Sequence, residues 1–237
     1  MRLLRKTAYL IALLMLLSVF FGCAADEPEQ PRPVRPYEPS INGDIEQQAI
    51  VRYPLTIITK RSYENECEML YPFIVTGGMD TLNISVYTAF ADFRAECGAK
   101  GGRIEYSTEF NRYGLLSLLM TCTSGNGKLL FSETANFNTD TGLRVRLSDC
   151  FGASSTGYRD KLSEAVRRYA EANSLTFISE EPAFDDSTQF LFTFGGLDLV
   201  FREYEVFTAE AGSPRIRVRC AEAAEVIGSD GLLNRVK

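Results

Sequence analysis

The feature that most limits the folds open to this chain is a run of alternating residues near its C-terminal end, residues 189–219. Phenylalanine occupies every second position of residues 190–194, and a second alternating series, residues 197–202, follows Gly195-Gly196. Because strand side chains alternate between two faces, and both glycines accept the positive φ of a tight turn, this run predicts a β-hairpin. A third alternating run, residues 215–220, predicts one more antiparallel strand. No part of this unit carries the residues of a catalytic apparatus.

The composition removes several classes of function. The chain has 237 residues, of which 45% are hydrophobic, enough for one domain of roughly 150–200 residues with a real core. Histidine is absent, which excludes Ser-His-Asp and Cys-His catalysis and any His-ligated zinc site. Removing the three basic residues Arg2, Arg5 and Lys6 of the first 22 positions takes the formal charge from −6 to −9. An acidic body argues against nucleic acid as a partner and is compatible with a cationic protein.

The first residues have the pattern of a signal peptide, residues 1–22. A basic start is followed by a thirteen-residue apolar run, residues 9–21, which is too short for a comfortable membrane span. The run ends in Gly22-Cys23, which resembles the bacterial lipobox. The resemblance implies that Cys23 becomes the lipid-modified first residue of the mature protein, anchored in the cell membrane and facing outside. An ordinary secreted protein cut nearby, or an uncleaved anchor, is the alternative.

The next segment, residues 23–46, is predicted to be an extended tether. Five of the nine prolines of the chain lie here, among charged residues, and such a composition cannot form a core. A PxxP ligand for SH3-like domains is the alternative interpretation of the same prolines.

The remaining residues predict an α+β fold, an antiparallel β-sheet packed by two amphipathic helices. Apolar residues at helical spacing indicate the helices, over residues 79–97 and 158–170. Strands are expected at residues 49–58, 69–75, 103–112, 115–123 and 128–138, and residues 228–237 are expected to be a loose tail.

Two groups of turn and strand residues resemble the extracellular domain of RsiV-type anti-sigma-V factors. The first is Asn136-Phe137-Asn138-Thr139-Asp140-Thr141-Gly142 with Leu147-Ser148-Asp149 and Phe151; the second is Phe201, Tyr204-Glu205, Ala211-Gly212, Pro214, Ile216 and Val218. The resemblance implies an RsiV-like unit in two parts, residues 47–140 and 141–227. These are motifs of fold rather than of chemistry.

The family domain binds lysozyme, and related segments accompany some peptidoglycan deacetylases. Only residues 1–6 precede the apolar run, and the chain has no room for a deacetylase domain, so we expect neither an anti-sigma factor nor a deacetylase. The expected function is a non-enzymatic, lipid-anchored cell-envelope protein that binds lysozyme or another cationic protein. A wall-modifying enzyme or its accessory domain is a further alternative.

Arginines on two predicted strands suggest a different ligand. Arg144 and Arg146 alternate on one strand, and Arg215, Arg217 and Arg219 alternate on another. If these strands are neighbours, they form a basic stripe suited to a cell-wall polymer such as peptidoglycan or teichoic acid. The alternative is pairing with acids such as Glu133, Glu203 and Glu205.

The link before the last predicted strand, residues 204–214, is the expected place for a shaped recognition loop. Tyr204 and Gly212 are its candidate binding residues, since binding residues are often found on loops.

Acidic residues give no catalytic prediction. Asp140 and Asp149 lie where a turn and a helix cap explain them, and Asp185-Asp186 with Glu180-Glu181 fit a solvated loop better than a calcium site. We therefore expect no catalytic residue, no metal and no cofactor.

The cysteines leave an open question. Cys67, Cys97, Cys122, Cys150 and Cys220 remain if Cys23 is lipid-modified, and none belongs to a CxxC pair. They form one or two disulfides outside the membrane or stay buried as thiols.

Overall fold

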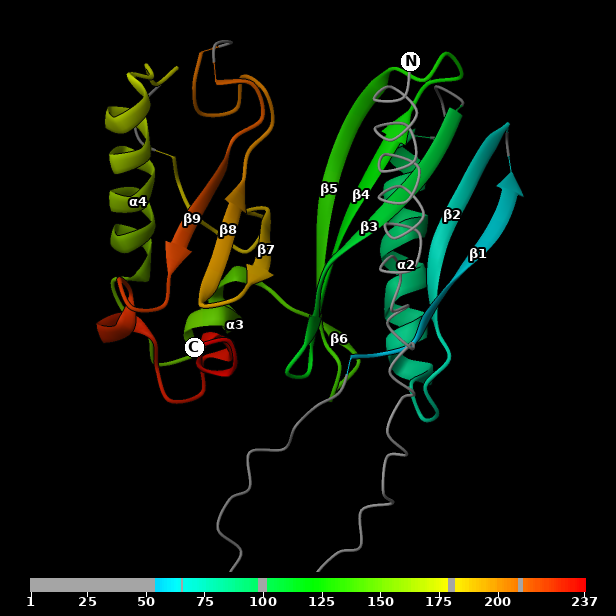
Figure 1. The fold of residues 1–237 in the computed structure, drawn as a ribbon, viewed down its shortest axis with the longest axis horizontal. Coiled ribbons are helices and arrows are strands. Elements are labelled where there is room, and N and C mark those ends of the chain that lie inside the picture. Colours follow the sequence, from blue (N-terminus) through cyan, green and yellow to red (C-terminus); the bar gives the residue numbers. More distant parts are fainter. Residues whose placement is uncertain (1–53, 65, 98–101, 179–181, 209–210) are drawn as a thin grey trace, which may run out of the picture. The chain divides into compact units, whose positions relative to one another are not determined.

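The computed structural model describes residues 54–64, 66–97, 102–178, 182–208 and 211–237 (Figure 1). These described residues belong to one compact unit. The predicted signal peptide, Cys23 and the proline-rich segment lie outside the described residues. No helix in the described ranges has the length and apolar character needed to cross a membrane.

The described chain is α+β, with two sheets and three α-helices (Figure 1). The first sheet contains β1 (Ile57–Glu64), β2 (Cys67–Ile74), β3 (Gly102–Arg112), β4 (Leu115–Thr123), β5 (Leu129–Asn138) and β6 (Leu143–Arg144). The second contains β7 (Phe190–Thr193), β8 (Gly196–Val200) and β9 (Arg215–Arg219). The helices are α2 (Asp80–Cys97), α3 (Leu147–Phe151) and α4 (Tyr158–Asn173), with the short 3-10 helices η3 (Ala224–Val226) and η4 (Leu232–Arg235) near the end.

The first sheet is mixed, which corrects the prediction of an antiparallel sheet. Its strands follow chain order, and β2 pairs with β3 in parallel from Cys67↔Gly102 to Met69↔Ile104. The reason is the connection. Helix α2 lies between these two strands in the chain and brings it back to the end of the sheet where β2 began, so β3 runs in the same direction as β2. The other neighbours in this sheet are antiparallel.

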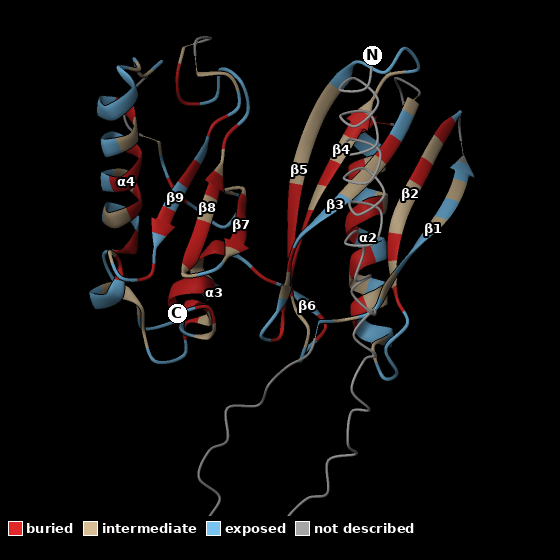
Figure 2. Cartoon of the chain, in the orientation of Figure 1, coloured by how far each residue is buried: buried red, intermediate tan, exposed pale blue. Residues whose placement is uncertain are grey.

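The first core lies between α2 and this sheet. Leu82, Val86, Phe90 and Phe93 recur at helical spacing and are buried, as expected for an amphipathic helix. They pack against buried residues of β2 to β5, among them Met69, Ile104, Leu118, Met120 and Phe137. Figure 2 shows these buried positions along α2 and the strands beside it.

The described cysteines include one disulfide-bonded pair and three free thiols. Cys97, at the end of α2, is bonded to Cys122 of β4, with their Cα atoms 6.4 Å apart. Cys67, Cys150 and Cys220 are buried free thiols.

The second sheet has the predicted order, with all neighbours antiparallel. Its turn is one residue earlier than expected. Thr193 pairs with Gly196, so the turn residues are Phe194 and Gly195, and only Gly195 has positive φ, at 74°. Gly196 belongs to β8, where a Cβ would collide with the carbonyl oxygen of Val218. The glycine pair therefore serves one turn conformation and one close backbone approach.

The last ten residues are packed, so the expectation of a loose tail is wrong. Leu233 and Val236 are buried in the second core, together with residues of α3, α4 and the second sheet. The amide of Gly195 donates a hydrogen bond to the carbonyl of Val236 at 2.7 Å. Too few apolar residues are involved to give a periodic signal in the sequence, although they complete the core.

A glycine in the turn after β5 is expected to be irreplaceable. Gly142 has a φ of 71°, and a Cβ there would lie 2.7 Å from the backbone nitrogen of Leu82 in α2. Gly142→Ala is expected to lower the free energy of unfolding by about 2–4 kcal/mol, through left-handed backbone strain and a clash with backbone that cannot move away. Urea unfolding measures this change.

Gly77→Ala is the matched control, because its Cβ would meet nothing within 4 Å and its φ is not positive. We expect it to change the free energy of unfolding by less than about 0.5 kcal/mol. Equal stabilities of the two variants would contradict the assigned role of Gly142.

Candidate binding cleft

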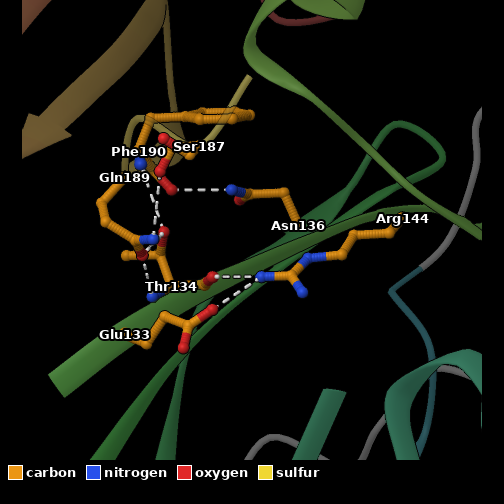
Figure 3. Close-up of polar contacts among 7 residues, drawn as sticks. All are labelled: Glu133, Thr134, Asn136, Arg144, Ser187, Gln189 and Phe190. Atoms are coloured by element: carbon orange, nitrogen blue, oxygen red, sulfur yellow. Dashed lines mark hydrogen bonds and ion pairs between the residues drawn. The ribbon is translucent and has the colours of Figure 1, made fainter. Parts of the chain in front are cut away.

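A polar cleft lies where β5 and β6 of the first sheet meet the segment leading into β7. This cleft has a volume of about 600 Å³ and is lined by Glu133, Thr134, Asn136, Leu143, Arg144, Val145, Arg146, Asp186, Ser187, Thr188, Gln189 and Phe190. Strands β5 and β6 form one wall, and the segment leading into β7 forms the other (Figure 3). The lining is rich in charged and amide side chains, which suits a polar ligand.

The inner wall of the cleft is the contact between β7 and the first sheet. This contact depends on which N–H and C=O groups of β7 point away from β8. The amide of Val200 donates to the carbonyl of Gln189 at 2.9 Å, on the β8 side. Backbone groups of neighbouring residues on a strand point to opposite sides. The N–H and C=O of Phe190 and the N–H of Phe192 therefore point away from β8, at the free edge of the second sheet.

Side chains of the first sheet complete this edge. Phe190 donates its amide to Thr134 Oγ1 at 3.1 Å, and Asn136 Nδ2 donates to the Phe190 carbonyl at 2.7 Å (Figure 3). The amide of Phe192 donates to Ser117 Oγ at 3.0 Å, and the Ser117 hydroxyl donates to Asn136 Oδ1 at 2.6 Å. Ser117, Thr134 and Asn136 are all buried. Three polar side chains thus replace a missing neighbouring strand and fix one sheet to the other, since buried backbone groups must be paired.

Arg144 lines the cleft beside Glu133 and Thr134. Its Nη2 donates to Glu133 Oε1 at 2.8 Å and to the Thr134 carbonyl at 3.3 Å (Figure 3). Gln189 also lines the cleft, and its Oε1 accepts hydrogen bonds from the amide of Thr134 at 2.6 Å and from the Thr134 hydroxyl at 2.8 Å.

Two neighbouring carboxylates, Asp185 and Asp186, which we name the acidic lip, precede β7 in the chain, and Asp186 lines the cleft. The hydroxyl and the amide of Ser187 donate to Asp185 Oδ1 at 2.6 and 2.8 Å, and these bonds lower the pKa of that carboxyl. Asp186 accepts from the amide of Ser148 at 3.2 Å. Its ion pair with Arg146 is loose, with Nη1 and Oδ2 4.0 Å apart and the side chains 71% and 46% exposed for Arg146 and Asp186. Such a pair contributes little and is readily exchanged.

The five arginines do not form one stripe. Arg144 belongs to the first sheet and Arg146 follows it, whereas Arg215, Arg217 and Arg219 lie on β9 of the second sheet. Pairing with acids is what the structure contains instead, although only Glu133 is among the expected partners. Arg215 pairs with Glu109 at 2.9 Å and Arg217 pairs with Asp198.

Tyr204 and Gly212 lie away from the cleft lining. Tyr204 is 62% exposed and has a φ of 61°, which is uncommon for a bulky residue. Its turn is closed on both sides of the tyrosine: the amide of Glu205 donates to the Arg202 carbonyl at 3.2 Å, and the amide of Arg202 donates to Glu205 Oε2 at 2.7 Å. Gly212 also has a left-handed φ, 59°.

The aspartates considered from the sequence have separate roles. Asp140 pairs with Arg235 at 2.9 Å, and Asp149 accepts from the Arg146 amide at 2.8 Å at the start of α3. Asp185 and Asp186 form the acidic lip, while Glu180 and Glu181 lie outside the described residues. Within the described ranges, no three His, Cys, Asp or Glu side chains gather in a way that could hold a metal ion.

Sequence reasoning missed the residues that build the inner wall. Ser117 interrupts an apolar strand, and Thr134 and Asn136 are polar residues on a buried face. That interruption is a signal, because a buried polar side chain needs a partner.

No family model and no curated protein matches the sequence. Solved structures do resemble the fold. A DUF3298 family protein from Pseudomonas aeruginosa PAO1 superposes with a TM-score of 0.56 and 11% identity, covering 76% of this chain and 97% of that one. A DUF3298 member from Bacteroides fragilis NCTC 9343 gives 0.52 and 10%, covering 79% and 98%. At these identities the similarity concerns fold alone, so the chain shares the α+β fold of DUF3298 proteins, and the narrower RsiV type is not distinguished.

Proposed function

We propose that this chain is a lipid-anchored binding protein of the outer cell envelope, without enzymatic activity, that recognises a cationic protein such as a lysozyme-like hydrolase. The acidic lip carries the proposal. Asp185 is held in its ionised form by Ser187, and Asp186 is paired only loosely with Arg146. A lysine or arginine of the partner would take the place of Arg146 beside Asp186.

The charge of the whole protein supports the same direction of recognition. The chain after residue 22 carries a formal charge of −9, which attracts a basic partner and speeds its encounter at low salt. The resemblance to RsiV-type domains implies lysozyme as the first partner to test.

A cell-wall polymer is the second candidate ligand, and Arg146 favours it. The guanidinium of Arg146 is mostly exposed and is not held in bidentate geometry by Asp186. A carboxylate of peptidoglycan or a phosphate of teichoic acid would displace Asp186 and bind Arg146 through two hydrogen bonds. The two candidate ligands therefore compete for opposite members of one ion pair.

A crossed pair of variants separates the two candidates. Asp186→Asn is expected to weaken lysozyme binding by the purified full chain roughly tenfold, about 1.4 kcal/mol, whereas Arg146→Gln leaves it unchanged or tightens it. Calorimetry at low salt measures both. The asparagine oxygen still accepts the amide of Ser148, so the fold of the acidic lip is kept.

If the ligand is a cell-wall polymer, the reverse order is expected in a pull-down with purified peptidoglycan. Arg146→Gln should then lose binding and Asp186→Asn should keep it. Absence of saturable, salt-sensitive lysozyme binding to the unaltered chain would overturn the first proposal. If lysozyme binds and neither variant changes the affinity, binding occurs outside the cleft.

A further inference from the structure

Strand β9 ends the second sheet on the side opposite β7 (Figure 1). On its β8 side, the amide of Phe201 donates to the Pro214 carbonyl at 3.1 Å, and the amide of Cys220 donates to the Gly195 carbonyl at 2.7 Å. Because backbone groups alternate along a strand, the N–H groups of Arg215, Arg217 and Arg219 point outward.

These outward groups have few partners. Within the described part of the chain, the N–H groups of Arg215, Arg217 and Arg219 make no hydrogen bond, and the Arg219 carbonyl accepts only from the turn that follows, at Glu222 and Ala223. Helix α4 lies beside β9 (Figure 1). Residues of both elements line a groove of about 280 Å³. The groove is lined by Ala165, Arg168, Tyr169, Ile216, Arg217, Arg219 and Glu222. The edge thus combines free backbone donors with space alongside.

The side chains of β9 determine which strand can pair there. The three arginines are exposed and alternate with the buried Ile216 and Val218. Arg215 and Arg217 are bound to acids of this chain, but Arg219 makes no ion pair with a described residue. A second copy of β9 would place arginines opposite arginines, which is unfavourable. An acidic strand would place carboxylates opposite them, which is favourable.

We propose that β9 is a strand-addition site for an extended, acidic segment of a partner protein. The added strand would pair with the outward N–H and C=O groups of Arg215 and Arg217 and with the N–H of Arg219. Acidic residues at alternate positions would lie beside the guanidinium groups, Arg219 first among them. In this mode of recognition the main chain supplies affinity and the alternate side chains supply specificity. The site is separate from the acidic lip and selects the opposite charge.

Position 219 allows a test that separates backbone pairing from charge. The Arg219 amide is not used by the fold, so Arg219→Pro removes one edge donor and leaves the β8–β9 pairing intact, as prolines on edge strands do. Arg219→Ala is the matched control, because it removes the same charge and keeps the N–H. The probe is a fluorescein-labelled peptide of alternating Glu and Thr, titrated with the purified full chain and followed by fluorescence polarisation.

We expect saturable binding to the unaltered chain, about threefold weaker binding to Arg219→Ala, and a further loss of at least about tenfold for Arg219→Pro. A peptide with N-methyl groups at every second residue should not bind the unaltered chain. Because the N-methylated peptide is measured on the unaltered chain, this measurement tests the proposal even if the proline variant fails to fold. Absence of binding, equal binding to the two variants, or equal binding of the N-methylated peptide would overturn the proposal.

Discussion

Replacing Asn136 with alanine is expected to lower the free energy of unfolding by about 3–5 kcal/mol, because two buried polar groups lose their partner and a small cavity remains. Asn136 is only 3% exposed, and its amide joins the Phe190 carbonyl of the second sheet to the Ser117 hydroxyl of the first. Without the Asn136 amide, the Phe190 carbonyl is buried with no hydrogen-bond donor, either from the protein or from water. Urea unfolding monitored by circular dichroism measures the change.

Asn173→Ala serves as the control, since Asn173 is exposed at the end of α4 and its side chain donates to the carbonyl of Tyr169 on the same helix. It is expected to cost less than about 1 kcal/mol. The double variant with Ser117→Ala should cost less than the sum of the two single changes, because Asn136 and Ser117 share one hydrogen bond. Equal costs for the Asn136 and Asn173 variants would show that the two sheets are joined by other contacts.

Removing the Cys97–Cys122 disulfide is expected to lower the free energy of unfolding by about 3–4 kcal/mol, the loop-closure term for this separation. The two cysteines are 25 positions apart and join the end of α2 to β4. The bond restricts the unfolded chain between them, which includes β3. Urea unfolding with and without reductant measures the effect.

The double variant Cys97→Ala with Cys122→Ala is the reference for this measurement, and reductant should leave its stability unchanged. In the folded protein the remaining thiols, Cys67, Cys150 and Cys220, are buried. Burial raises the pKa of the Cys150 thiol well above its ordinary value, which keeps it unreactive. If reductant destabilises the reference variant equally, the effect does not come from this disulfide.

Elements with a clear period were predictable from the sequence. Spacing of apolar residues placed the helix that the structure has at Asp80–Cys97, a run of apolar residues placed β4, and alternation placed β8. The direction of β3 relative to β2 was not predictable from either strand, because it depends on how α2 connects them. The membership of β6 and β9 in different sheets is likewise absent from their own patterns, and this is why no single arginine stripe forms.

The candidate cleft was predictable only in pieces. Arg144 and Arg146 were identified, but their neighbours Asp186 and Gln189 lie some forty to fifty positions further along the chain. Ser117 and Asn136 look like isolated polar residues in apolar strands until β7 is placed against them. In each of these long-range hydrogen bonds only the side-chain partner is visible in the sequence, since the backbone of any residue can supply the other partner.

The side chains that complete the edge of β7 also set a limit on assembly. An open sheet normally offers two edges, and a molecule with two open edges can pass strand pairing from one copy to the next without end. Here Thr134 and Ser117 already accept the edge N–H groups of Phe190 and Phe192, and Asn136 donates to the Phe190 carbonyl. Strand addition to the second sheet is therefore confined to β9, so this sheet can take up one strand per molecule and cannot serve as a link in a growing fibre.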